Sequence, residues 1–314
     1  MKVAVVATML NEAHAIPELL DALAGQTRPP EEIILVDAGS TDGTSATVRA
    51  YAARLPTVRL LEAPGCNRAK GRNVGVTAAA SPLLVLTDAG CVPAPDWVAR
   101  MVAPLERDAA LTLVSGIATP RGADHLETCI ARCTLSFQLD VGGVALHPGG
   151  RALAFHRDLW EKVRGFPEAF DFCDDVAFIL ATAAAGARQH LEPAATVSWH
   201  ARRRYRDVVR QFYHYAEDSA WAGLSGTLHL RTVARSAGGM ACLVAGLVSR
   251  HWLPWTLLVG LAGAYLGRKA RQGCFDVPSW RTSYRVPLVL LAIHAGTMAG
   301  ILHGQWRRLA SPPR

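Results

Sequence analysis

The sequence predicts an α/β protein with a mostly parallel sheet flanked by helices, followed by hydrophobic, membrane-associated helices. Two observations lead to this prediction. Before about residue 230, short runs rich in β-branched residues or leucine alternate with segments of helical apolar spacing, which is typical of a parallel sheet covered on both faces. After that point, long apolar segments replace the alternation. We therefore predict two regions, residues 1–230 and residues 231–314.

The predicted strands occupy residues 2–9, 32–36, 57–61 and 83–87. The first intervening helix has an apolar face formed by Ile16, Leu19, Leu20 and Leu23. In open parallel sheets, ligands bind at the carboxyl ends of the strands. Asn11, Asp37 and Asp88 lie at these ends, so they are the first candidates for a binding site.

The C-terminal apolar segments are residues 237–249, 252–267 and 286–303. Only the last approaches the length of about 20 residues that a spanning helix needs. The first two are compatible with short spans, a re-entrant pair broken near Arg250 and Pro254, interfacial helices, or buried helices of a soluble domain. Basic runs at residues 268–272 and 306–308 flank these segments like interfacial anchors.

Charge is divided unevenly along the chain. Residues 1–199 contain 17 Lys/Arg and 22 Asp/Glu, whereas residues 200–314 contain 16 and 4. A region that is both basic and apolar favours a membrane surface with anionic lipids over nucleic acid. Seven cysteines without a CxxC pair indicate neither a disulfide framework nor a zinc site, and they fit a reduced cytosolic setting. The apolar N-terminus is followed by Asn-Glu-Ala-His, so we expect a buried strand there and not a signal peptide.

The segment EEIILVDAGSTDGT, residues 31–44, combines a strand that ends at Asp37 with a turn that contains Asp42. By itself it is compatible with a strand closed by an Asx-type turn, and Asp42 is compatible with a capping role alone. Its surroundings favour a binding site. Asn11 and Glu12 follow the first strand directly, QTRPP occupies residues 26–30, and NRAKGRNVG occupies residues 67–75.

The order and spacing of these motifs resemble the N-terminal half of the family 2 glycosyltransferases, which have a GT-A (Rossmann-like) fold. The resemblance covers roughly residues 1–215 and implies that residues 1–230 form a GT-A domain that binds a nucleotide-diphosphate sugar. It implies that Asp37 hydrogen-bonds the nucleobase, that Glu12 lies near the ribose, and that Arg72 helps to hold the nucleotide, with Asn11 also among the donor-binding residues. Arg68 and Lys70 are weaker candidates, because cations on loops are usually only solvated.

The family places an Asp-x-Asp pair at the end of the fourth strand, where it holds a divalent cation, Mn²⁺ or Mg²⁺, against the donor diphosphate. In the fragment LTDAGC, Asp88 matches the first acid and Gly90 replaces the second. Three interpretations follow, in order of preference. Another group completes the metal site. Cationic side chains replace part of the metal. Catalysis has been lost and only binding remains.

The segment GFPEAFDFCDDVAFILATAAAG, residues 165–186, resembles the acceptor side of the family site. Its adjacent acids, Asp174 and Asp175, open a predicted helix. They are compatible with caps at the positive end of the helix dipole, but the resemblance favours catalysis. It implies that Asp175 is the general base that deprotonates the acceptor hydroxyl, and that Asp174 binds the acceptor or orients its neighbour.

The segment VSWHARRRYR, residues 197–206, supplies further candidates. His200 aligns loosely with a histidine that binds the metal in some family members, although a lone histidine is more often structural. As a ligand it would explain how Gly90 is tolerated. Arg202, Arg203 and Arg204 are candidates for neutralising diphosphate or for contact with lipid headgroups.

The resemblance therefore implies a membrane-associated, inverting glycosyltransferase of the hexosyltransferase type, acting in the cell envelope. Its donor is a nucleotide-diphosphate sugar, and its acceptor is a hydroxyl of a membrane-embedded or lipid-linked molecule. The catalytic domain is expected on the cytoplasmic side, and no nucleic acid is expected as a partner. The Gln-x-x-Arg-Trp signature of processive members is absent from the sequence, which favours transfer of a single sugar. The alternatives are an inactive nucleotide-sugar-binding scaffold and a sugar-phosphate nucleotidyltransferase.

Overall fold

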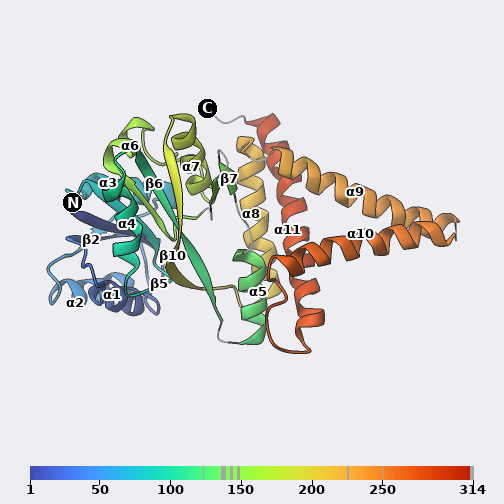
Figure 1. The fold of residues 1–314 in the computed structure, drawn as a ribbon, viewed down its shortest axis with the longest axis horizontal. Helices are drawn as coiled ribbons and strands as arrows, with labels where there is room; N and C mark the ends of the chain where they lie inside the picture. Colours follow the sequence, from blue (N-terminus) through green and yellow to red (C-terminus); the bar gives the residue numbers. More distant parts are fainter. Residues whose placement is uncertain are drawn as a thin grey trace. The chain divides into compact units, whose positions relative to one another are not determined.

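The computed structural model describes residues 1–122, 124–135, 139–141, 144–146, 149–224, 226–249 and 251–311 (Figure 1). The chain forms two compact units. The first comprises Met1–Arg121 and Phe137–His200, and the second comprises Gly122–Ser136 and Ala201–Arg314. Each unit is described by itself.

The first unit contains one large sheet. Its strands are β1 (Val3–Met9), β2 (Glu32–Asp37), β3 (Val58–Glu62), β4 (Leu83–Asp88), β5 (Cys91–Pro93), β6 (Leu111–Arg121), β9 (Leu153–His156) and β10 (Arg188–His200). They lie in the order β3-β2-β1-β4-β9-β6-β10-β5, and only β9 and β5 run antiparallel to their neighbours. β7 (Leu139–Val141) and β8 (Val144–Leu146) form a separate pair. The predicted mostly parallel sheet and the four predicted strands are confirmed.

Helices cover both faces of this sheet, because successive strand residues point to opposite sides. One face packs against α1 (Ile16–Ala24), α2 (Thr44–Ala52) and α4 (Trp97–Arg107). The other packs against α3 (Arg68–Ala78), α6 (Arg157–Lys162) and α7 (Asp174–Ala184). In β1, Val5 belongs to the first hydrophobic cluster and Val6 to the second. This double burial explains why the strand is a continuous apolar run.

The second unit is helical. It contains α5 (His125–Leu135), α8 (Tyr205–Ala222), α9 (Gly226–Ser249), α10 (Trp252–Arg271) and α11 (Thr282–Ala310). Gly296, Gly300 and Gly304 of α11 lie directly against the α8 backbone; a Cβ at Gly300 would come within 2.2 Å of the Tyr213 carbonyl oxygen. Because α8 packs so closely on α11, both helices belong to the second compact unit, which resumes at Ala201.

Two helices have the length and composition to cross a membrane, at His229–Ser249 and Thr282–Ala310. The expectation that only the last apolar segment is long enough is therefore wrong. The helix that contains residues 237–249 begins at Gly226, because its polar first turns continue the helix ahead of the apolar run. Arg250, where a break was expected, lies outside the described residues.

Candidate active site

The carboxyl ends of β1, β2 and β4 meet at one edge of the sheet. In the parallel register, Met9 of β1 lies opposite Asp37 of β2, and Thr8 lies opposite Asp88 of β4. Hydrogen bonding between the strands thus brings together acids that are 51 positions apart in the chain. This edge is the place where an open α/β sheet binds its ligands.

Asp37 is held by hydroxyl groups from the turn that follows it. Its side-chain Oδ1 accepts from the backbone N–H of Ser40 at 3.0 Å and from the Ser40 hydroxyl at 2.6 Å, and its Oδ2 accepts from the Ser45 hydroxyl. Burial acts to raise the pKa of Asp37, but these hydrogen bonds outweigh it and the pKa lies below its ordinary value. The residue is only 4% exposed, so the turn presents a rigid, ionised carboxylate.

The loop after β1 is joined to the same turn. Asn11 has a positive φ of 56°, and its side-chain oxygen accepts from the Thr41 N–H at 2.9 Å. The Glu12 N–H donates to the Thr44 hydroxyl at 2.8 Å. Asp42 accepts from the N–H groups of Ala13 and Thr44, each at 3.1 Å, as expected of a residue that caps the turn. The two loops therefore form one connected rim.

Arg72 reaches the strand ends because α3 lies unusually close to β1. A Cβ at Gly71 would come within 2.7 Å of Thr8, and one at Gly75 within 2.4 Å of Val6, so only glycine allows this approach. The Arg72 side chain is 4% exposed. Its Nη2 donates to Asp88 Oδ1 at 3.1 Å, and its Nη1 donates to Asp174. Both terminal nitrogens are thus committed to acids of this chain.

Asp174 and Asp175 lie in different environments although they are neighbours at the start of α7. The Asp174 side chain is 1% exposed, and burial raises its pKa to about 6 against the opposing charge of Arg72. Asp175 instead accepts from the Gly150 N–H at 2.9 Å through Oδ2 and from the Val176 N–H at 2.7 Å through Oδ1. One acid is therefore tied to Arg72, and the other is oriented by the backbone.

Arg151 lies beside Asp88 in the same group of charged residues, and it was not identified as a candidate from the sequence. Its Nε lies 3.8 Å from Asp88 Oδ2, and its guanidinium lies 4.4 Å from the centre of the Trp199 ring. Burial acts to raise the pKa of Asp88, but the charges of Arg72 and Arg151 outweigh it and lower the pKa. The available signal was Gly-Gly-Arg directly before a strand at residues 149–151. It matched no motif.

Two asparagines of the NRAKGRNVG segment fix the loop that leads to α7. Asn67 Nδ2 donates to the Glu168 carbonyl at 2.7 Å. Asn73 accepts from the Phe166 N–H and donates to the Phe166 carbonyl, both at 2.8 Å. The two separate sequence motifs are therefore parts of one structure, and the asparagines, which the sequence did not single out, join them.

Gly90 borders open space at the end of β4. A Cβ there would meet no atom within 4 Å. In the antiparallel ladder Trp199 lies opposite Cys91, and the exposed His200 follows Trp199 as the last residue of β10. Among the described residues, no group of three or more His, Cys, Asp or Glu side chains is arranged to hold a metal. One carboxylate, one imidazole and open space fit a divalent cation that takes its other ligands from diphosphate and water.

Arg202 and Arg203 lie in the second unit. Arg202 Nε donates to Gln211 Oε1 at 3.4 Å, and Arg203 Nε lies 3.8 Å from the buried carboxylate of Glu127. These contacts hold the arginines within the helical unit.

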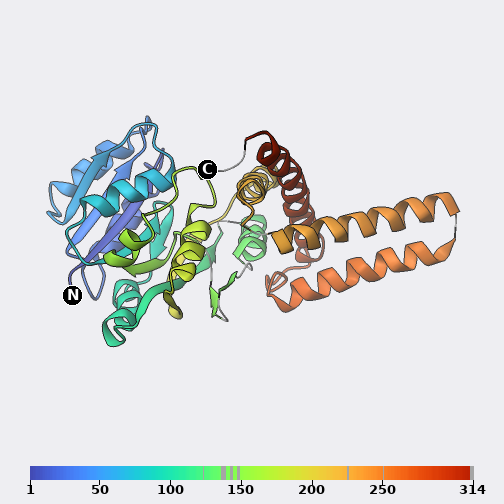
Figure 2. The ribbon, with the colours of Figure 1, turned by 90° about the horizontal axis from the view of Figure 1, so that it is seen from above.

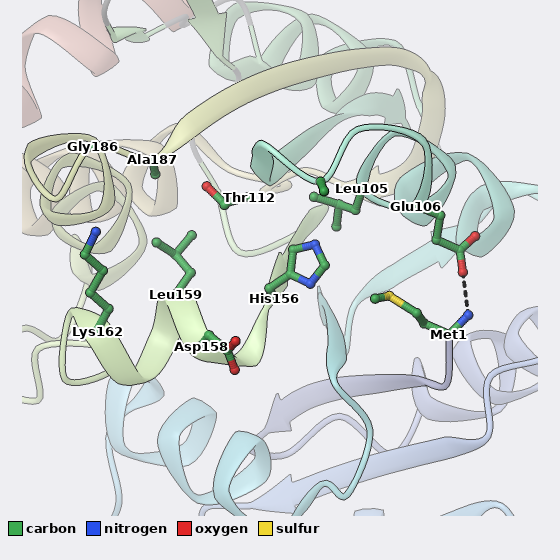
Figure 3. A pocket seen from close by; sticks show the side chains of 11 residues that line it. Met1, Leu105, Glu106, Thr112, His156, Asp158, Leu159, Lys162, Gly186 and Ala187 are labelled. Atoms are coloured by element: carbon green, nitrogen blue, oxygen red, sulfur yellow. Dashed lines mark hydrogen bonds and ion pairs between the residues drawn. The ribbon is translucent and has the colours of Figure 1, made fainter.

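A cavity of about 610 Å³ lies elsewhere in the first unit (Figure 3). Its lining includes Thr112, His156 and Ala187, which stand at the amino ends of β6 and β10 and at the far end of the antiparallel β9. The Lys162 ammonium is bonded to the Ala185 carbonyl at 2.7 Å, and Glu106 holds the Met1 amine at 2.8 Å. Because this cavity lies at the opposite edge of the sheet, it is not part of the candidate site.

The acid-rich carboxyl edge of this mostly parallel sheet is where an α/β protein of this kind binds its ligand. The sequence matches the family described as glycosyl transferase family 2 over residues 4–191, and the chain belongs to that family.

The fold is similar to that of a mannosyltransferase from Pyrobaculum calidifontis solved with GDP-Man and Mn²⁺, with a TM-score of 0.69 and 24% identity over 95% of this chain and 86% of that one. Two curated relatives are more local matches. Glycosyltransferase AglE of Haloferax volcanii is 32% identical over 33% of this chain and 35% of its own length. Validoxylamine A glucosyltransferase of Streptomyces hygroscopicus is 34% identical over 36% of this chain and 25% of its own length. The matched part thus spans about a third of each relative or less.

Proposed function

We propose that the chain is a membrane-associated, inverting and non-processive hexosyltransferase that moves one sugar from a nucleotide-diphosphate donor to a hydroxyl of a membrane-embedded or lipid-linked acceptor. The observation that carries this proposal is the position of Asp175. Gly150 binds Asp175 at 2.9 Å, and the next residue, Arg151, lies 3.8 Å from Asp88. The expected base and the expected donor-side acid are therefore joined through one dipeptide.

The donor nucleotide is proposed to bind along the rim formed by the loops after β1 and β2. Asp37 accepts hydrogen bonds from the nucleobase, with Asn11 and Glu12 near the ribose. The Asp37 carboxylate is already ionised and immobilised by Ser40 and Ser45, so little side-chain entropy is lost when the nucleotide binds.

The diphosphate is proposed to lie at Asp88. Asp88 and His200 would hold a divalent cation, Mn²⁺ or Mg²⁺, whose chemistry when bound is to neutralise charge that develops on the leaving diphosphate. Arg151 lies on the same carboxylate and contributes fixed positive charge. Arg72 is proposed to help hold the nucleotide through the acids that it binds. Since its terminal nitrogens are bonded to Asp88 and Asp174, it positions those acids more than it binds the nucleotide.

Asp175 is proposed to take the proton of the acceptor hydroxyl as that oxygen attacks the anomeric carbon and the diphosphate leaves from the opposite face. The Gly150 and Val176 N–H groups orient the carboxylate for this step. Asp174 serves as a positioning residue through its ion pair with Arg72. Single displacement at the anomeric carbon accounts for inversion.

The apolar helices of the second unit support the proposed membrane association. We propose that the GT-A domain extends to residue 230, that it stands on the cytoplasmic side, and that the hydrophobic region at residues 231–314 keeps it at the membrane where the acceptor resides. Arg202 and Arg203 are proposed to contact diphosphate or headgroup phosphates.

Asp175→Asn tests this function. The purified full chain is titrated with GDP-mannose and UDP-glucose in the presence and absence of Mn²⁺, and turnover is measured with a glycolipid acceptor that offers a free sugar hydroxyl. We expect the variant to keep donor affinity within about twofold and to lose at least about 100-fold in turnover, the scale of general base catalysis. Unchanged turnover would refute the role of Asp175. Failure of the parent chain to bind any nucleotide sugar would refute the proposed donor class.

A further inference from the structure

Helices α9 and α10 run side by side as a hairpin (Figure 2). No residue of α10 is buried within the chain. The large apolar side chains exposed on the hairpin include Met240, Val244, Leu247, Val248, Trp252, Leu253, Trp255, Leu257, Val259 and Leu261. An exposed apolar surface of this extent indicates a partner of low polarity.

The two arms of the hairpin pack on each other at both ends. Near the tip, a Cβ at Gly246 would lie 2.7 Å from the Trp255 indole, so the ring rests on the α9 backbone. Near the base, the Arg235 guanidinium lies 5.9 Å from the centre of the Tyr265 ring. The arms therefore behave as one paired element with its apolar side chains turned outward.

Positive charge is concentrated at the base of the hairpin. We define the basic base as Arg231, Arg235, Arg268, Lys269 and Arg271. The first two lie in the early turns of α9 and the others in the last turns of α10. Residues 219–275 contain no Asp or Glu. The basic base therefore complements anionic phospholipid headgroups. Each basic residue near such a surface contributes about 1 kcal/mol to the free energy of membrane binding.

The apolar arms are somewhat shorter than a bilayer core, and of the two only α9 meets the length and hydropathy of a candidate span by itself. At 1.5 Å per residue, the apolar parts of the two arms, residues 236–249 and 252–267, are about 21 and 24 Å long. The hydrocarbon core of a bilayer is about 30 Å thick. The long side chains of the basic base make up part of the difference, because their charged ends can extend to the headgroups while their stems lie in the core. In the sequence, Ser249, Arg250 and His251 separate the two apolar segments, and Trp252 and Trp255 follow them. Polar residues flanked by tryptophan suit the opposite headgroup layer. A hairpin that ended at the bilayer centre would instead bring the charge of this sequence into hydrocarbon, at a cost of about 3 kcal/mol per charged residue.

Helix α11 does not fit the bilayer core, although its composition permits a span. It lies along α8, which carries Glu217 and Asp218, and Arg307 of α11 lies 3.4 Å from both of these acids. His303 lies 3.3 Å from Glu217. A span by α11 would therefore carry these ionisable groups into hydrocarbon. α8 and α11 instead run across the base of the hairpin, and Ser236 of α9 is 2.8 Å from His294 of α11 (Figure 1).

We propose that the α9–α10 hairpin crosses the lipid bilayer, with its basic base in one headgroup layer and Ser249 and His251 in the other, and that α11 lies in the interface on the side of the base. The inference rests on the proposed membrane association and identifies the element that provides it. The exposed face of α11 suits an interfacial helix, since Leu291, Leu302, Trp306 and Leu309 are each more than 60% exposed.

Cysteine labelling in spheroplasts of an expression host tests the topology. The background carries Cys66→Ser and Cys242→Ser, because the other native cysteines are buried. Single cysteines replace Ser249 at the tip, Trp280 and Leu309 at the two ends of α11, and the exposed Ala50 of α2 as a marker of the catalytic unit. A membrane-impermeant maleimide is applied before and after permeabilisation, and a permeant maleimide confirms that each thiol is reactive.

We expect Ser249→Cys to label in intact spheroplasts and the other three sites to label only after permeabilisation, with at least about a tenfold difference. Labelling of Ser249→Cys and Ala50→Cys from the same side would overturn the crossing hairpin. Labelling of Trp280→Cys and Leu309→Cys from opposite sides would show that α11 spans. Neither outcome depends on turnover, so failure of this inference is distinguishable from failure of the proposed reaction.

Discussion

Arg72 donates a 3.1 Å hydrogen bond to Asp88 while its other terminal nitrogen binds Asp174. One buried cation thereby links the end of β4 to the start of α7, two segments that are 86 residues apart in sequence. Since a buried charge without its partner is costly, this link is essential for the shape of the site.

Arg72→Met should lower the free energy of unfolding by about 3–5 kcal/mol, because it leaves Asp88 and Asp174 without their shared cation. The control is Arg100→Met. It removes the ion pair between Asp96 and Arg100, whose side chain is 46% exposed. This substitution should lower the free energy of unfolding by at most about 1 kcal/mol. Thermal unfolding followed by circular dichroism at pH 7.5 measures both. Equal losses in the two variants would contradict a structural role for the Arg72 cluster.

Asp174 should make stability depend on pH in an unusual direction. Its folded pKa of about 6 lies above the ordinary value, so the folded state binds this proton more tightly and stability falls as pH rises from about 4 to 6. In the Asp174→Asn variant, this fall in stability between about pH 4 and 6 is absent. The midpoint of thermal unfolding of the variant, relative to the parent, should therefore rise across that interval and level off above it. A difference that is constant from pH 4 to 7 would show that Asp174 does not titrate there.

Gly150→Ala should disrupt the site because a Cβ would lie 2.0 Å from Arg72 Nη2. The guanidinium cannot move away without losing Asp88 or Asp174, so we expect a loss of about 2–4 kcal/mol, the range for overpacking combined with a weakened buried pair. Gly90→Ala is the matched control, since a Cβ there meets nothing within 4 Å. Similar melting temperatures for the two variants would indicate that the loop before β9 adjusts freely.

Gly90→Asp tests the metal interpretation. The open space at Gly90 can accept a carboxylate next to Asp88, so Mn²⁺ should bind at least about tenfold more tightly in the presence of a nucleoside diphosphate. The same substitution should restore the affinity that His200→Ala loses. Isothermal calorimetry with Mn²⁺ and GDP or UDP measures both effects. If His200→Ala binds Mn²⁺ as the parent does, His200 is not a ligand.

Arg151→Gln should weaken binding of a nucleoside diphosphate about tenfold or more, while nucleoside binding stays unchanged, because the guanidinium next to Asp88 is proposed to answer diphosphate charge. Arg188→Gln serves as the control, since the Arg188 side chain is 64% exposed in its ion pair with Asp108. Calorimetric affinities for GDP, UDP and the free nucleosides separate the charge effect from a general loss of the site. An equal weakening of nucleoside binding would assign Arg151 a structural role instead.

The sequence by itself determined the class of fold and the strand ends that carry acids. Period-2 and period-3.6 patterns are local properties, and parallel strands place their carboxyl ends at one edge whatever their order. Asp37 and Asp88 could therefore be named as candidates, whereas Asp174 and Asp175 were named because residues 165–186 resemble the acceptor side of the family site. The helical extent of residues 226–249 was underestimated, since polar first turns hide a helix from an apolar count.

Only the tertiary structure decided what each charged side chain contacts. Arg72 is committed to two acids, Arg151 joins Asp88 and Trp199, and Asn73 fixes the loop before α7; these contacts link segments that are up to 102 residues apart. The close approach of α11 to α8 likewise depends on backbone contact at glycines and not on hydropathy. Long-range pairing depends on how the elements pack and on which partner offsets the cost of burying a charge, and neither is encoded in the spacing of residues along the chain.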